Sequence, residues 1–300
     1  MSSISKYLFL LIPAGLIISL NACTKAEMDD DFSKGDAPPV GAYTNSSEIS
    51  PENLIVHLAF EDNYNDGKNT LSEATAHGTT SFVAGRKGKA YQGSTTGFVS
   101  YSNPGAVATL TSFTVSFWLN TQKHEGGAQG VFALTKEDSS FWSNFFAIIE
   151  GNNSSSNRMQ LKLHFEKNVT PPIPNIENWV DPAPELRPDD MYGGWRHVCY
   201  TYDEATSILT WYVNGQKLDL PTDITDRKSG NGTEGLGALA FKSATRFVIG
   251  GFQNYLGAPY NGLESWMLNY TGMLDEFRIY KKAITSQEAN ALYQLERQGR

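Results

Sequence analysis

One segment constrains the fold more than any other part of the chain: WRHVCYTYDEATSILTWYVNGQKLDL, from Trp195 to Leu220. Its dipeptide Asn214-Gly215 separates two runs in which apolar and polar residues alternate. Asn and Gly both tolerate the positive φ angles of a type I′ turn, which joins two paired strands. We therefore predict a β-hairpin in which Val213 pairs with Gln216 and one apolar face packs inward.

A third strand precedes this hairpin. Residues 195–202 alternate in the same way, and a short polar turn at 203–207 separates them from the hairpin. Three consecutive antiparallel strands joined by short turns form a β-meander. The chain therefore contains at least one antiparallel sheet.

Other alternating runs predict further short strands, and the clearest is FTVSFWLN at 113–120. The remaining predicted strands lie at 54–60, 130–136, 145–150, 159–166, 246–251 and 272–280. A capping box, Thr285 with Glu288 three residues later, begins the single predicted helix. Many short strands with one helix predict an all-β fold of two packed sheets.

Three motifs, in the same order, resemble those of the concanavalin A-like, laminin-G-like jelly-roll domains. The central motif is W.HV..TYD followed after a short turn by WYVNG, within 195–215. GMLDEFRIYKKAITSQEANALY at 272–293 is similar to the closing motif of that family, and HLAFEDNYNDGKN at 57–69 is similar to its opening strand and loop. The resemblance implies a two-sheet antiparallel jelly-roll sandwich with one short C-terminal helix. We assign residues 51–300 to this domain.

The first 22 residues have the pattern of a signal peptide. Lys6 precedes the apolar run 7–20, which is shorter than the roughly 20 residues that a membrane-spanning helix needs. The tetrapeptide LNAC ends at Cys23 and resembles a bacterial lipobox, which implies cleavage before Cys23 and acylation of its thiol. An ordinary signal peptide followed by a chance cysteine is the alternative.

Residues 23–50 are rich in acidic residues and poor in aliphatic ones, so we expect a disordered tether. The acidic cluster at 27–31 resembles the export signal of surface-exposed lipoproteins of Gram-negative bacteria, and a solvated spacer is the alternative. Together with the lipobox, this cluster implies a protein that is lipid-anchored in the outer membrane and exposed at the cell surface.

The net charge and the number of cysteines limit which partners the protein can bind and whether it can form a disulfide. The net charge is −8 and the basic residues form no stripe, which argues against nucleic acid as a partner. Once Cys23 is acylated, Cys199 is alone and no internal disulfide can form. Cys199 alternates with His197 and Thr201 on one strand face, so we expect it to be a small core residue.

Three segments are long for the loops of a jelly roll: 168–194, 221–245 and 252–270. The first holds a tryptophan among six prolines, and the third interleaves aromatic rings with amides and carboxylates. Rings stack on the C–H face of sugars, and polar groups bind sugar hydroxyls. We predict a carbohydrate-binding site with Trp266 as its main contact, made of Trp266, Trp179, Tyr255, Tyr260 and Tyr270. Coverage of the sandwich edge by these rings is the alternative.

One carboxylate suggests a metal. Asp275 alternates with Phe277 and Ile279, so we expect it to face the core, where an unpaired charge costs several kcal/mol. In the family that the chain resembles, an Asp at this place commonly holds a structural calcium ion together with an acidic residue after the first strand. Asp62 and, less closely, Asp66 match that residue, and Ca²⁺ prefers such oxygen ligands. Hydrogen bonds from backbone N–H groups to Asp275 are the alternative.

Evidence for catalysis is slight. The glucanases of this superfamily place carboxylates in the pattern Glu-x-Asp on one strand, but the only such tripeptide here is at 27–29, in the predicted tether. The histidines show no zinc-binding spacing. The sequence therefore favours a surface-anchored lipoprotein that binds a polysaccharide within a glycan capture system. A glycoside hydrolase with an atypical site and a protein-binding adhesion module are the alternatives.

Overall fold

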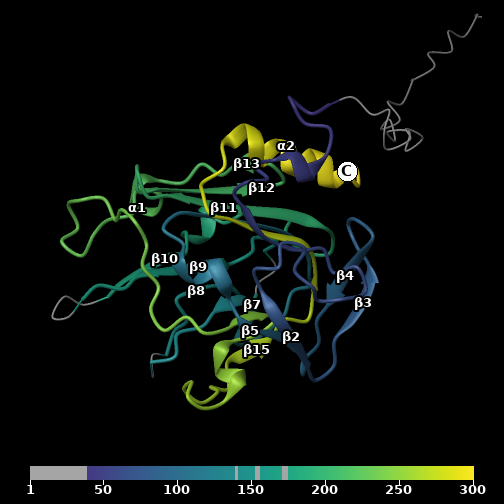
Figure 1. Cartoon of the computed structure of the whole chain (residues 1–300), viewed down its shortest axis with the longest axis horizontal. Coiled ribbons are helices and arrows are strands. Elements are labelled where there is room, and N and C mark those ends of the chain that lie inside the picture. Colours follow the sequence, from purple (N-terminus) through teal and green to yellow (C-terminus); the bar gives the residue numbers. More distant parts are fainter. Residues whose placement is uncertain (1–38, 139–140, 153–155, 171–174) are drawn as a thin grey trace, which may run out of the picture. The chain divides into compact units, whose positions relative to one another are not determined.

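Two β-sheets pack face to face in the computed structural model, which describes residues 39–138, 141–152, 156–170 and 175–300 (Figure 1). Sheet 1 contains β1 (Leu54–Leu58), β3 (Ser81–Ala84), β4 (Lys89–Gln92), β6 (Phe113–Asn120), β11 (Arg196–Asp203), β12 (Ile208–Val213), β13 (Gln216–Lys217) and β16 (Met273–Tyr280). Sheet 2 contains β2 (Ser72–His77), β5 (Phe98–Asn103), β7 (Ala128–Leu134), β8 (Phe145–Glu150), β9 (Leu161–Lys167), β10 (Ile176–Val180), β14 (Phe247–Ile249) and β15 (Met267–Asn269).

The strand order confirms the predicted antiparallel jelly-roll sandwich. Sheet 1 runs β13-β12-β11-β6-β16-β4-β3 with β1 also paired to β16, and sheet 2 runs β10-β9-β8-β7-β14-β5-β2. Among the strands of the described ranges, every pair is antiparallel except that of β15, which pairs in parallel with β7. The helices are short: α1 (Thr222–Thr225), α2 (Ser286–Arg297) and the 3₁₀ turns η1 (Ser46–Glu48), η2 (Gly105–Thr109), η3 (Pro184–Leu186) and η4 (Gln253–Leu256). None of the helices in the described ranges has both the length and the apolar character needed to cross a membrane.

The predicted meander is confirmed as β11, β12 and β13. Asn214 and Gly215 have φ angles of 49° and 73°, and Val213 pairs with Gln216 as the turn requires. The Asn214 side-chain oxygen accepts the backbone N–H of His197 at 2.9 Å. This bond ties the turn to the neighbouring strand β11 and fixes the register of all three strands.

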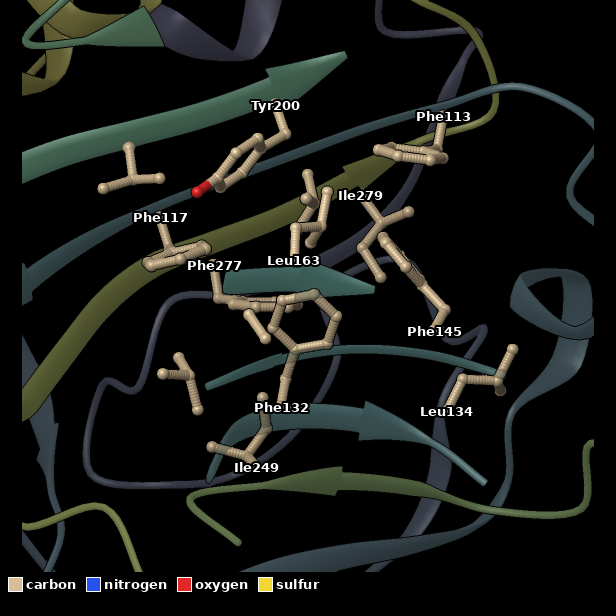
Figure 2. Packing of buried hydrophobic residues seen from close by; sticks show 14 of the residues in the cluster. Phe113, Phe117, Phe132, Leu134, Phe145, Leu163, Tyr200, Ile249, Phe277 and Ile279 are labelled. Atoms are coloured by element: carbon tan, nitrogen blue, oxygen red, sulfur yellow. The ribbon is translucent and has the colours of Figure 1, made fainter. Parts of the chain in front are cut away.

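The core lies between the two sheets and is rich in phenylalanine (Figure 2). Phe117 and Phe277 of sheet 1 stack with ring centroids 5.8 Å apart, and the ring of Phe132 from sheet 2 meets Phe277 edge-on at 5.4 Å. All three side chains are fully buried. Loss of one such ring costs about 3–5 kcal/mol of folding free energy, so these contacts hold the sheets together.

Helix α2 covers the outer face of sheet 1 beside β12 and β13 (Figure 1). The predicted capping box is present, because the Thr285 hydroxyl accepts the N–H of Glu288 and the Glu288 carboxylate accepts the N–H of Thr285. Leu292 and Leu295 of this helix pack in one buried cluster with Cys199. Cys199 is thus the small core residue that the sequence predicts, and burial raises the pKa of its thiol.

The segment before β1 belongs to the folded domain, which corrects the predicted tether boundary at residue 50. Ile49 is fully buried against α2, and the Arg300 guanidinium donates to the backbone oxygen of Thr44 at 2.9 Å. Because these contacts need an ordered backbone, the domain begins before residue 51. The predicted signal peptide, Cys23 and tether residues 23–38 lie outside the described residues.

A β-bulge in β16 overturns the predicted orientation of Asp275. The pairing of β16 with β6 shifts between Asp275 and Arg278, and Glu276 has a φ of 46°. One extra residue reverses the alternation of faces. Phe277 therefore enters the core, whereas Asp275 lies opposite Trp118 on the outer face of sheet 1, where it is buried.

Candidate functional site

The outer face of sheet 2 carries a row of three rings across β8, β9 and β10. Successive side chains of a strand alternate between faces, and the register places both Phe146 and Trp179 beside His164. The ring of His164 lies 4.7 Å from that of Phe146 and 4.5 Å from that of Trp179. Burial lowers the pKa of His164, so this ring is neutral near pH 7 and packs as a third aromatic group.

Two more indoles extend this row. Trp142 stacks on Phe146 at 5.5 Å with an interplanar angle of 15°, and it meets Trp179 edge-on at 5.1 Å and 81°. Trp266 lies 5.8 Å from Trp142. The three indoles of Trp142, Trp179 and Trp266 are each half-buried, so part of each ring remains accessible.

The backbone at the start of β15 holds Trp266 in place. Its carbonyl oxygen accepts the N–H of Ala128 at 2.8 Å. Gly127, which precedes Ala128, has a φ of +55°. A Cβ atom at this position would stand only 2.3 Å from the Trp266 carbonyl oxygen. Glycine is therefore required at 127 for Trp266 to sit this close to β7.

A polar row borders the indoles. Lys162 of β9 lies between two carboxylates, with its ammonium 2.8 Å from Glu150 and 3.2 Å from Asp181. Burial alone would lower the pKa of Lys162, but its hydrogen bonds and attraction to these two carboxylates raise it. Asp181 also accepts the side-chain amide of Gln160 at 2.9 Å. The row thus presents donors and acceptors in fixed alternation.

The indoles and the polar row line one pocket of about 620 Å³, which we call the indole pocket. Its lining residues are Gly127, Trp142, Ile148, Glu150, Lys162, Trp179, Asp181 and Trp266. Apolar rings combined with a few well-placed polar groups are typical of small-molecule sites of this size. Such a pocket suits a ligand with an apolar face and hydroxyl groups at its rim.

The structure brings together two of the five predicted binding residues, Trp179 and Trp266. Tyr270 instead lies fully buried in the core, with its hydroxyl donating to the Met273 backbone oxygen at 3.0 Å. Tyr260 is also buried, and its hydroxyl contacts Thr245 at 3.0 Å. These two tyrosines stabilise the fold, as the edge-covering alternative expects.

Tyr255 is half-buried but lies away from the indole pocket. Its ring packs 5.5 Å from Phe98, and its hydroxyl donates to the backbone oxygen of Met267 at 2.8 Å. It therefore supports the segment that carries Trp266 rather than lining the pocket.

Sequence reasoning missed Trp142. The strand at 145–150 was predicted correctly, but Trp142 lies in the bend before it, where strand alternation does not apply, so the pattern gave no signal for its contact with Phe146. Trp179 was placed in a proline-rich loop, but it lies on strand β10. Its pairing with β9 is what aims it into the pocket.

The three predicted calcium ligands do not form one site. Asp62 is exposed and lies 3.9 Å from the Lys89 ammonium. Asp66 closes the turn after β1 by accepting backbone N–H groups at 2.8–3.0 Å from His57, Lys68, Thr70 and Leu71. Within the described part of the chain, no three side chains of His, Cys, Asp or Glu come together as a metal-ligand set.

The Asp275 carboxylate accepts hydrogen bonds from backbone N–H groups, which is the alternative to calcium binding. One carboxylate oxygen accepts the N–H of Lys87 at 2.8 Å, and the other accepts the N–H of Glu276 at 2.7 Å. Each oxygen of Asp275 thus has a backbone donor, and among the described residues neither Asp62 nor Asp66 joins it in a ligand set. These residues therefore do not fit a calcium ion in this arrangement.

The sequence matches the family model of the concanavalin A-like lectin/glucanases superfamily over residues 92–290. The chain belongs to this superfamily. This confirms the predicted resemblance and accounts for the two-sheet topology. No curated protein matches the sequence significantly.

Solved structures with the same fold include carbohydrate-binding proteins. Domain 4 of AbnA, an extracellular arabinanase from Geobacillus stearothermophilus solved with arabinotriose, aligns with a TM-score of 0.51 at 17% identity, over 81% of this chain and 98% of that domain. Botulinum neurotoxin type C, whose cell entry depends on two ganglioside molecules, aligns with a TM-score of 0.54 at 14% identity, over 83% of this chain. The present chain spans about half of that toxin chain, with 52% covered. At these identities the likeness is one of fold.

Proposed function

We propose that the indole pocket binds a carbohydrate chain. The main evidence for this proposal is that Trp142, Trp179 and Trp266 line one pocket with Lys162 and its two carboxylates, which belong to the polar row. The half-buried indoles offer ring faces on which sugars can stack, and the polar row offers hydrogen-bond donors and acceptors for sugar hydroxyls. The fold relatives that bind arabinotriose and gangliosides support carbohydrate as the ligand class.

We further propose that the protein is a lipoprotein anchored at the outer surface of the outer membrane, where it captures polysaccharide. The lipobox-like LNAC ending at Cys23 and the acidic cluster at 27–31 support this location. In this arrangement the lipid provides attachment, and the indole pocket faces glycans outside the cell. Hydrolysis is the competing function, because the same superfamily includes glucanases.

A glycan array with the purified full chain, followed by calorimetric titration of the best ligand, tests this function. Trp142→Ala and Trp179→Ala should each weaken binding about thirtyfold, because a stacked indole at a hot spot contributes roughly 2 kcal/mol or more. Trp195→Ala is the matched control, since Trp195 is also half-buried but does not line the pocket. Its affinity should equal that of the wild type.

Three outcomes separate the candidate functions. Glycan binding that the pocket variants lose, without release of reducing sugar, supports the proposal. Release of reducing sugar that depends on Glu150 or Asp181 would replace it with hydrolysis. Binding to proteins but to no glycan would favour the adhesion module.

A further inference from the structure

A second pocket of about 670 Å³ lies next to the indole pocket, and we call it the polar pocket. Its lining residues are Gly151, Asn152, Ser156, Arg158, Gln160, Pro184, Glu185 and Arg187. Each pocket has the size that holds a drug-sized ligand. Together they offer more room than a single sugar unit fills.

The two pockets share a wall. Asp181 lines the indole pocket, yet it accepts a hydrogen bond from Gln160 of the polar pocket at 2.9 Å. The guanidinium of Arg187, also in the polar pocket, lies 3.6 Å from the same carboxylate. Glu150 of the indole pocket directly precedes Gly151 of the polar pocket. The pockets therefore adjoin along one line of polar side chains.

The polar pocket has a different chemistry from its neighbour. No aromatic side chain is among its lining residues in the described ranges, and most of its polar groups are amides and guanidinium groups. Arg158 donates to the backbone oxygen of Arg187 at 2.6 Å, which places the two arginines side by side. Each guanidinium carries five N–H donors in one plane, well suited to oxygen acceptors of a ligand.

Charge in this pocket is balanced. Arg187 lies near Asp181, Arg158 lies 3.9 Å from Asp189, and Glu185 adds a further carboxylate. The whole chain also carries a net charge of −8. This balance gives an anionic ligand no electrostatic advantage, whereas mixed donors and acceptors suit uncharged hydroxyl groups.

We infer that the two pockets form one groove, in which the indole pocket stacks one part of a neutral oligosaccharide and the polar pocket hydrogen-bonds its continuation. This inference rests on the proposed carbohydrate binding and adds the length and charge of the ligand. The protein thus recognises several consecutive units of a neutral polysaccharide chain rather than a single sugar.

Chain-length dependence of binding tests this inference. The full chain is titrated with two-unit and six-unit arabino-, xylo- and cello-oligosaccharides, and with oligogalacturonide of six units as the anionic probe. A neutral six-unit chain should bind about tenfold more tightly than its two-unit counterpart, equivalent to about 1.4 kcal/mol. The oligogalacturonide should gain nothing over the neutral six-unit chain.

Variants of residues in the polar pocket then test whether this pocket causes the tighter binding of the six-unit chain. Arg158→Ala and Glu185→Ala should each remove most of the six-unit advantage while leaving two-unit binding unchanged, because both residues line the polar pocket and neither lines the indole pocket. Arg246→Ala is the matched control, because Arg246 is exposed and lines neither pocket. If Arg158→Ala does not fold, as judged by its melting curve, Glu185→Ala and the wild-type length series still decide.

The results distinguish two kinds of failure. Equal affinity for two-unit and six-unit chains, or a length advantage that both variants retain, overturns the groove and leaves carbohydrate binding intact. Preference for the oligogalacturonide overturns the neutral ligand. If none of the probes and no glycan on an array binds, carbohydrate binding itself fails and the groove fails with it.

Discussion

Replacement of Arg278 tests how the folded domain tolerates a buried charge on the outer face of sheet 1. The side chain is almost fully buried, and its Nε donates to Glu296 at 2.7 Å. Its Nη2 binds the Glu276 carboxylate and donates to the Ser46 hydroxyl at 3.2 Å. Arg278 therefore joins β16, α2 and the segment before β1.

Arg278→Met should remove the cation and leave two buried carboxylates. Burial opposes ionisation of Glu276, but the charge of Arg278 lowers its pKa below the usual range. Breaking one partner of a buried ion pair costs about 3–5 kcal/mol. For a domain of this size, each kcal/mol lowers Tm by about 2–4 °C, so we expect a loss of roughly 6–20 °C.

Thermal and urea unfolding of two variants measure this loss. The triple variant Arg278→Met, Glu276→Gln, Glu296→Gln should recover part of the stability, because it no longer buries two charged carboxylates without the Arg278 cation. A Tm for Arg278→Met within 2 °C of the wild type would refute the reasoning. So would a triple variant that is no more stable than the single one.

Three further predictions concern Asp275, calcium and the anchor. Burial raises the pKa of Asp275 to about 8, so between about pH 4 and pH 8 the native state holds a proton that the unfolded state has released. The free energy of unfolding should therefore fall as pH rises from about 4 to 8. Asp275→Asn should reduce this pH dependence, measured by urea unfolding at several pH values. An unchanged slope would show that other groups cause it. Because the three predicted ligands form no common site among the described residues, chelator should leave the wild-type Tm unchanged, and a drop reversed by Ca²⁺ would restore the calcium hypothesis. Wild-type cells should incorporate labelled fatty acid into the protein whereas Cys23→Ala should not, and equal labelling would exclude Cys23 as the acylated residue.

Features that depend on neighbouring residues in the chain were predictable from the sequence. The turn at Asn214-Gly215 and the cap at Thr285 each rest on side chains within a few positions, so their patterns carry the information. The strand at 113–120 was also found with correct bounds, because its alternation is strong. The family resemblance then supplied the arrangement of the sheets.

Features that depend on pairing between distant segments were not predictable in the same way. The bulge at Asp275 arises from the register of β16 against β6, which no local pattern of β16 reveals. Strand β2 was missed because SEATAH is polar and mostly exposed. Composition alone also could not separate Tyr270, which enters the core, from Trp266, which lines the pocket, because their positions depend on how distant segments pack.

A structure of the full chain with the oligosaccharide selected on the array would test the central claim most directly. We predict a sugar ring stacked on Trp142, Trp179 or Trp266, with its hydroxyls hydrogen-bonded to Lys162 or to a carboxylate beside it. A sugar bound at another surface, with the indole pocket empty, would contradict the account.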